Sequence, residues 1–272
     1  MKISDVVSAA TNTFSLPQVC TKLREVLDDP RSEFSDLAKV IATDPILSAK
    51  LLRLANSAFF RFSQQVETVQ KAVSIMGGEA VYDLAIAEAM SCAKKQFESN
   101  LLDTDQLWLD SLFRGVLAKE IAKSKRVRGA ERFFVLGIMS RLSEMVIAAH
   151  FESSYERYIN QKKLSLPWHA QRAELGFTFA NANGAICEVW GLPPKICRPI
   201  GTVFSVQNKK LDNDAKTLQL AIKMTFHYYK DPRFVDVSSL EPEISLWQKG
   251  EDEMKDVIES SYNEAKMLQS FF

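Results

Sequence analysis

The chain has 272 residues, of which 46% are hydrophobic and 25% charged, and this composition is typical of a globular protein with a sizeable core. Its 34 Lys and Arg balance 34 Asp and Glu, so the zero net charge disfavours a dedicated nucleic-acid binder. No stretch reaches the roughly 18 apolar residues of a membrane span, and the first 15 residues lack the apolar core of a signal peptide. We therefore expect a cytoplasmic protein with neither a nucleic-acid nor a membrane partner.

The residues that most often bind metals are few and scattered. The four cysteines lie far apart, without a C-x-x-C pair, and are expected to be buried thiols: Cys20, Cys92, Cys187 and Cys197. No two of the three histidines stand one helical turn apart: His150, His169 and His227. The sequence therefore predicts no metal and no other cofactor.

Apolar residues recur at spacings of three and four, with only ten Gly and nine Pro, so we predict an all-α protein. The expected helical segments include single helices over 132–151 and 175–193, and a helix, Gly-Gly turn and helix over 69–97. A terminal helix over 250–272 carries acidic residues in its first turns, where they complement the helix dipole. A soft boundary is placed near residue 100.

The segment TDPILSAKLLRLANSAFF contains the clearest helix start. Asp44 can cap the free amides, Pro45 suits the first turn, and Asn56 can end the helix in a left-handed conformation. Two interpretations stay open for the residues around this helix: they stabilise the fold, or they form an interaction surface. The candidates for such a surface are Asp44, Asn56, Ser57, Phe59 and Phe60.

These motifs together resemble the HDOD family. The resemblance rests on LPQVCTKLREVLDDP, LAKVIATDPILSAKLLRLANSAFF, VQKAVSIMGGEAVYDLAI, LWLDSL and EVWGLPPKI, and it covers roughly residues 14–230. It implies a bacterial, all-helical signalling output or interaction module related to HD-type metal phosphohydrolases. On this basis, 1–272 forms one HDOD protein, with an N-terminal helical lobe over 1–100 and a degenerate HD-like lobe with a C-terminal helical extension over 101–272.

The resemblance also implies where metal ligands would stand in an active relative. HD hydrolases hold divalent metals with several His and Asp side chains, because such ions lower the pKa of bound water and stabilise phosphoryl charge. Aligning LWLDSL, FFVLGIMSRLSEMVI and the segments that follow them puts non-histidine residues at these positions: Asp110, Ser140, Arg141, Phe179, Val203 and Phe204. The guanidinium of Arg141 repels a cation and has no lone pair to bind one, so we predict no metal centre.

We therefore expect a non-catalytic signalling module that acts through protein contacts with unidentified signalling partners. One alternative is a metal-dependent phosphohydrolase that uses Asp110 with ligands outside this alignment. A second is a small-molecule sensor in which Arg141 binds a phosphate or carboxylate in the vacated pocket, lined by Met139 and Met145. Glu174 and Glu188, four turns apart on one predicted helix, are expected to be surface carboxylates. The sequence identifies neither the partner nor the oligomeric state.

Overall fold

The structure is a computed structural model that describes residues 1–57, 59–60, 62–162, 165–205, 211–234, 247 and 250–272. These residues form α-helices joined by turns and contain no strand. The helices are α1 Ile3–Thr13, α2 Gln18–Asp28, α3 Phe34–Ala42, α4 Pro45–Ala55, α5 Val69–Met76, α6 Gly78–Lys94, α7 Thr104–Ser124, α8 Arg132–Met139, α9 Leu142–His150, α10 Glu152–Lys162, α11 Pro167–Leu175, α12 Phe179–Val189, α13 Pro194–Thr202, α14 Asn213–Tyr228 and α15 Glu251–Gln269. The all-α prediction is confirmed.

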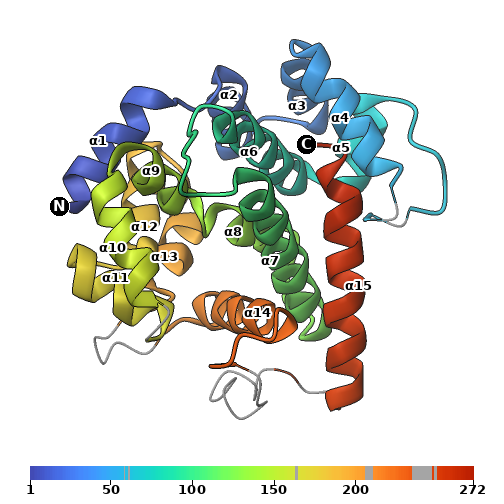
Figure 1. Cartoon of the computed structure of the whole chain (residues 1–272). Helices are drawn as coiled ribbons and strands as arrows, with labels where there is room; N and C mark the ends of the chain where they lie inside the picture. Colours follow the sequence, from blue (N-terminus) through green and yellow to red (C-terminus); the bar gives the residue numbers. More distant parts are fainter. Residues whose placement is uncertain (58, 61, 163–164, 206–210, 235–246, 248–249) are drawn as a thin grey trace.

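Helix α7 runs through the middle of the molecule (Figure 1). It packs against α8, α14 and α15, and most of its circumference is buried, as expected for a central helix. Helices α2 to α6 lie at one end of α7, whereas α9 to α13 gather on another side (Figure 1). The predicted boundary near residue 100 falls in the segment between α6 and α7.

Both ends of the chain pack against helices that are far from them in the sequence. Helix α1 packs against α9 and α12 rather than staying with the other N-terminal helices (Figure 1). Helix α15 runs along α7 and brings the C-terminus near α4 and α5 (Figure 1). There the carbonyl of Phe272 accepts a hydrogen bond from the Ser91 hydroxyl at 2.6 Å. Both ends therefore tie the two groups of helices together.

The start of α4 follows the sequence prediction, but its end does not. The Asp44 carboxylate accepts hydrogen bonds from the backbone amides of Ile46 and Leu47, both at 3.0 Å. Asn56 lies at φ −89°, so the predicted left-handed ending is wrong. Its amide instead donates to the carbonyls of Leu52 and Val66 and accepts from the Val66 amide, each at 2.8 Å. The side chain ends the helix by tying it to the following loop.

One segment that we predicted as a single helix is broken, and the helix in another is shorter than predicted. The segment over 132–151 divides into α8 and α9, with Ser140 and Arg141 between them. In the segment over 175–193 the helix begins only at Phe179, because α11 ends at Leu175, Gly176 adopts φ +85°, and Thr178 caps α12. Glu174 and Glu188 therefore belong to different helices, and their predicted placement on one helix is wrong. Periodicity alone did not reveal the break at Ser140 because apolar residues continue on both sides of it.

Helices α7 and α8 approach closely at a pair of glycines. A β-carbon added to Gly137 would lie 2.2 Å from the backbone nitrogen of Gly115, and one added to Gly115 would lie 2.6 Å from the carbonyl oxygen of Phe134. Real β-carbons do not approach backbone atoms this closely, so both positions require glycine. This contact holds the end of α8, and the break after it, against α7.

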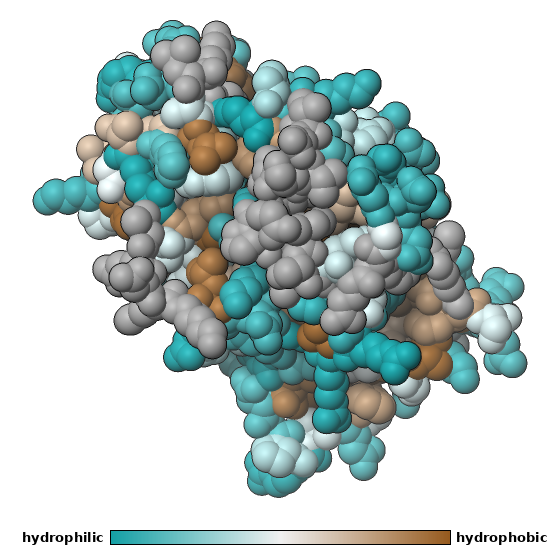
Figure 2. Space-filling model, turned by 90° about the horizontal axis from the view of Figure 1, so that it is seen from below, coloured by the Kyte–Doolittle hydropathy of each residue, from teal (hydrophilic) through white to brown (hydrophobic). Residues whose placement is uncertain are grey.

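The surface on the face shown in Figure 2 is mostly hydrophilic where the structure describes it, with hydrophobic residues in smaller areas. By length and composition, 132–150 is the one described segment apolar enough to cross a membrane, but 78% of it is buried inside the protein. Such burial is expected of a core segment.

Three cysteines are buried as predicted, whereas Cys92 is exposed, so that part of the prediction is wrong.

Candidate functional site

A cavity of about 220 Å³ opens among α7, the junction of α8 with α9, and α10 to α14. All six residues aligned with the metal-ligand positions line it: Asp110, Ser140, Arg141, Phe179, Val203 and Phe204. They come from segments nearly a hundred residues apart in the sequence. The fold therefore brings together the positions that the resemblance assigned to one site.

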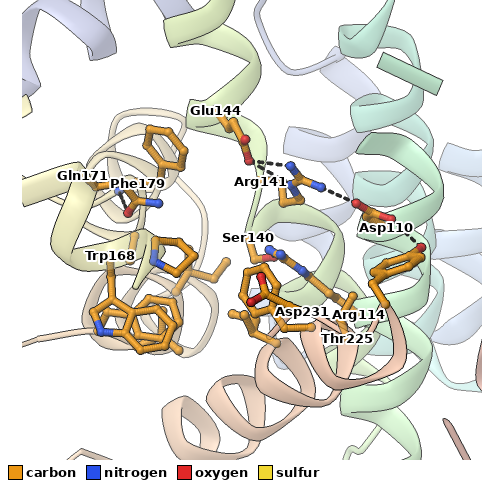
Figure 3. A pocket seen from close by; sticks show the side chains of 18 of the residues that line it. Asp110, Arg114, Ser140, Arg141, Glu144, Trp168, Gln171, Phe179, Thr225 and Asp231 are labelled. Carbon is orange, nitrogen blue, oxygen red and sulfur yellow. Dashed lines mark hydrogen bonds and ion pairs between the residues drawn. The ribbon is translucent and has the colours of Figure 1, made fainter. Parts of the chain in front are cut away.

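Arg141 occupies the polar end of this cavity, between two carboxylates (Figure 3). Its Nη1 donates to Asp110 at 2.6 Å, and its Nε and Nη2 donate to one oxygen of Glu144 at 2.9 and 2.7 Å. Burial by itself lowers the pKa of Arg141, but Glu144 and Asp110 more than offset this effect and hold it above its usual value. The guanidinium is a permanent cation that balances one of the two negative charges in contact with it.

Two tyrosine hydroxyls also donate hydrogen bonds to these carboxylates. The Tyr155 hydroxyl donates to Glu144 at 3.1 Å, and the Tyr229 hydroxyl donates to Asp110 at 2.7 Å. Burial raises the pKa of both tyrosines, and the neighbouring carboxylates raise it further. Both hydroxyls therefore stay protonated at neutral pH and act as donors. The cluster Asp110, Arg141, Glu144, Tyr155 and Tyr229 is a connected set of charge-assisted hydrogen bonds.

The break between α8 and α9 positions Arg141 in this cluster. The break leaves a free carbonyl at the end of α8 and a free amide at the start of α9. Asn183, fully buried on α12, satisfies both: its amide nitrogen donates to the Ser140 carbonyl at 2.7 Å, and its oxygen accepts from the Ser143 amide at 2.6 Å. Ser143 also donates its hydroxyl to the Phe179 carbonyl at 2.9 Å. Helix α12 therefore fixes the turn that carries Arg141.

The rest of the cavity is largely aromatic and aliphatic. Trp168 and Phe204 stack with ring centroids 4.2 Å apart, and Trp168 lies across the cavity from Asp110 (Figure 3). Phe179 and Phe226 form further walls together with Ile200. A cavity that combines aromatic walls with convergent polar groups is typical of a small-molecule site.

Arg114 also enters this cavity, and the sequence analysis did not name it. It lies on α7 and reaches toward Ser140, where its Nη1 donates to the hydroxyl oxygen at 3.5 Å (Figure 3). Burial and, to a smaller extent, the charge of Arg141 lower its pKa, while Asp110 and Glu144 raise it, and together these effects bring the pKa of Arg114 to about 10. The sequence held a signal for this residue, because four residues separate Arg114 from Asp110 and place both on one helix face.

Other candidates from the sequence lie away from the cavity. Met139 and Met145 are buried but do not line it, so their predicted role as its walls is wrong. None of the three histidines lines it: His150 hydrogen-bonds Thr13 at 3.0 Å, and His227 hydrogen-bonds the Phe234 carbonyl at 2.7 Å. The cavity therefore has no imidazole ligand.

The candidates for an interaction surface lie at the start of α4 and in the segment directly after it. Asp44, Asn56 and Ser57 cap or terminate α4 through the hydrogen bonds of their side chains. Phe59 is buried against Phe134, with ring centroids 4.8 Å apart, whereas Phe60 is half-buried. These five residues have structural roles in the chain, and their role in an interaction stays a prediction.

The residues at the aligned positions do not fit a divalent metal. A metal site of the hydrolase type needs several imidazole and carboxylate ligands converging on one point. Here the two carboxylates converge on a guanidinium, and the other aligned positions hold a hydroxyl and apolar side chains. Within the described ranges, no three His, Cys, Asp or Glu side chains are grouped so that they could hold a metal ion.

Comparison with known proteins places the chain in a family. The HDOD domain profile matches residues 14–204. A curated protein of uncharacterised function from Treponema pallidum is 23% identical over 201 residues, which cover 71% of this chain. The match covers only 38% of the length of that relative.

Solved structures share the fold. An HDOD domain protein of unknown function from Geobacter sulfurreducens is 17% identical with a TM-score of 0.70, covering all of this chain and 99% of that one. A "putative phosphohydrolase" from Shewanella amazonensis is 21% identical with a TM-score of 0.71, covering 98% of this chain and 95% of that one. A "putative signal transduction protein" from Marinobacter aquaeolei is 16% identical with a TM-score of 0.70, covering 96% of this chain and 60% of that one. The profile match spans well over half of the sequence, and this chain belongs to the HDOD domain family.

Proposed function

We propose that this protein is a non-catalytic HDOD module of bacterial signal transduction that works through protein contacts. The observation that carries the proposal is the position of Arg141, whose guanidinium binds Asp110 and Glu144 where the aligned positions of a hydrolase would hold a metal. An arginine in this place supplies fixed positive charge but cannot lower the pKa of a bound water molecule. The cluster joins α7 to the α8–α9 junction through hydrogen bonds and ion pairs instead of metal ligands.

The first experiment measures metal content and turnover in the same preparation. Protein purified without chelator is analysed for metals before and after incubation with manganese, iron, nickel and zinc salts, and is assayed with a phosphodiester and with nucleotides. We expect substoichiometric metal and no metal-stimulated hydrolysis. One or two ions per chain, with turnover that disappears in Asp110→Ala, would overturn the proposal in favour of a metal-dependent phosphohydrolase.

A second experiment separates signalling from chemistry in the cell. A strain lacking this protein is complemented with the wild type or with Asp110→Asn, which removes the charge but keeps an acceptor for Tyr229. We expect Asp110→Asn to restore the output of the wild type if the variant accumulates to the same level. Loss of output at equal protein level would argue that the carboxylate has a chemical role and would contradict the proposal.

A further inference from the structure

Arg114 is a buried cation with unused hydrogen-bonding capacity. Arg114 is only 8% exposed, and its Nε atom has no hydrogen-bond partner. Besides the long contact with Ser140, its guanidinium lies 5.6 Å from the centre of the Phe226 ring. Within the described part of the chain, no carboxylate stands at ion-pair distance from it, whereas Arg141 and Arg233 each contact at least one. A buried charge without a paired counter-ion is costly, so the site favours an anion from outside.

Arg141, the arginine suggested by the sequence for ligand binding, is less suited to this role. Its Nε, one Nη1 hydrogen and one Nη2 hydrogen already serve Asp110 and Glu144. An incoming anion would have to compete with two protein carboxylates for it. Arg114 has no such competitor in contact, and its side chain lines the same cavity.

We propose that this cavity binds a small planar aromatic carboxylate, whose carboxylate group pairs with Arg114 and whose ring lies among Phe179, Phe204 and Phe226. The proposal extends the non-catalytic function: the pocket that lacks metal ligands keeps a ligand site, through which a small molecule could regulate the module. It does not depend on the absence of catalysis, because binding and turnover are measured separately.

The charges around the cavity favour a carboxylate over a phosphate. Three arginines and three carboxylates line it, so its formal charges cancel: Arg114, Arg141, Arg233, Asp110, Glu144 and Asp231. A phosphate monoester carries about −1.5 to −2 at neutral pH and would face three carboxylates with one arginine to bind it. A carboxylate carries a single charge, which matches one guanidinium fork.

The size and walls of the cavity favour one aromatic ring. An apolar cavity of about 150 Å³ in a protein core holds benzene. The cavity here is about 220 Å³, which leaves room for a ring and one polar substituent. Aromatic walls favour a flat ligand because rings pack on one another in stacked or edge-on geometry.

The test compares three ligands of nearly equal shape on the intact protein. Benzoate carries the proposed carboxylate, benzamide replaces it with a neutral amide, and phenyl phosphate replaces it with a phosphate ester. Binding is followed by calorimetry and by the NMR resonances of arginine Nε–H groups. We expect benzoate to bind in the millimolar range, at least about tenfold tighter than benzamide, and to shift the Nε–H resonance of Arg114.

Variants assign the effect to Arg114. Arg114→Gln should weaken benzoate binding at least about tenfold while benzamide binding changes little. Arg128→Gln, at an exposed arginine outside the cavity, should leave benzoate binding unchanged. If Arg114→Gln does not fold, Arg114→Lys keeps the charge without the planar fork and should show an intermediate loss.

Four results would overturn the proposal. Three are no saturable benzoate binding, equal binding of benzoate and benzamide, and benzoate binding that survives Arg114→Gln. The fourth is tighter binding of phenyl phosphate than of benzoate, which would favour a phosphate ligand. None of these outcomes bears on the non-catalytic role, whereas metal-stimulated turnover would end that role and leave the Arg114 site standing.

Discussion

Removing Arg141 should leave two carboxylates without their shared counter-ion at the same end of the cavity. The substitution Arg141→Met keeps much of the side-chain volume but breaks the ion pairs with Asp110 and Glu144. The side chains of these three residues are 12%, 15% and 7% exposed, which places the cluster among buried rather than surface ion pairs. Removing one partner of a buried pair typically costs about 3–5 kcal/mol, because the remaining charges lose their compensation.

We expect the lower end of this range, about 3 kcal/mol, because Tyr155 and Tyr229 continue to donate to the two carboxylates. For a chain of this size, this loss should lower the melting temperature by about 6–12 °C. Urea denaturation gives the free energy of unfolding, and calorimetry gives the melting temperature. A loss below about 1 kcal/mol, the range of exposed ion pairs, would refute the reasoning.

The matched control neutralises the two partners as well. Adding Asp110→Asn and Glu144→Gln to Arg141→Met removes the unpaired charges while keeping the side-chain shapes. We expect this triple variant to recover at least half of the lost stability, because replacing a whole buried ion cluster by neutral groups is often close to neutral. A triple variant less stable than Arg141→Met would mean that packing, and not charge, accounts for the loss.

Two further predictions concern other parts of the fold. Burial raises the pKa of Asp83 to about 7, so the folded protein binds a proton there that the unfolded chain releases; stability should fall as pH rises from about 4 to 7 and level off above. Urea denaturation across this pH range should show that the free energy of unfolding falls less steeply with pH in Asp83→Asn than in the wild type. An unchanged pH dependence would contradict the assignment to Asp83. Gly137→Ala should cost about 3 kcal/mol or more through its clash with Gly115, whereas Gly250→Ala, which meets no atom within 4 Å, should cost less than about 1 kcal/mol; equal losses would contradict the close contact.

Much of the fold could be predicted from local signals. The start of α4 depends on Asp44 and Pro45, which are neighbours in the sequence, so the cap could be read without any tertiary information. The turn between α5 and α6 likewise follows from Gly77, which adopts φ +82°. Helical periodicity predicted the class of the fold because the core-facing positions repeat along each helix.

The break between α8 and α9 could not be predicted in this way. The sequence over 132–151 reads as one helix because apolar residues continue on both sides of Ser140 and Arg141 and no proline interrupts them. The chain turns at Ser140 because Asn183, more than forty residues later, supplies partners for the backbone groups that a continuous helix would have paired internally. Asn183 can supply these hydrogen bonds only because α12 packs against α9.

Some features of the candidate site likewise follow from the sequence, and others only from the tertiary structure. The sequence by itself determined which chemical groups stand at the aligned positions, and a chain without imidazoles there lacks the usual ligands of a hydrolase metal wherever it folds. The tertiary structure alone decided how the arginines are used. Arg141 meets Asp110 across 31 residues, while Arg114 is buried near Ser140 and Phe226 without a carboxylate in contact. These side-chain contacts arise from the packing of helices that are far apart in the chain. Local sequence patterns do not reveal which helices pack together.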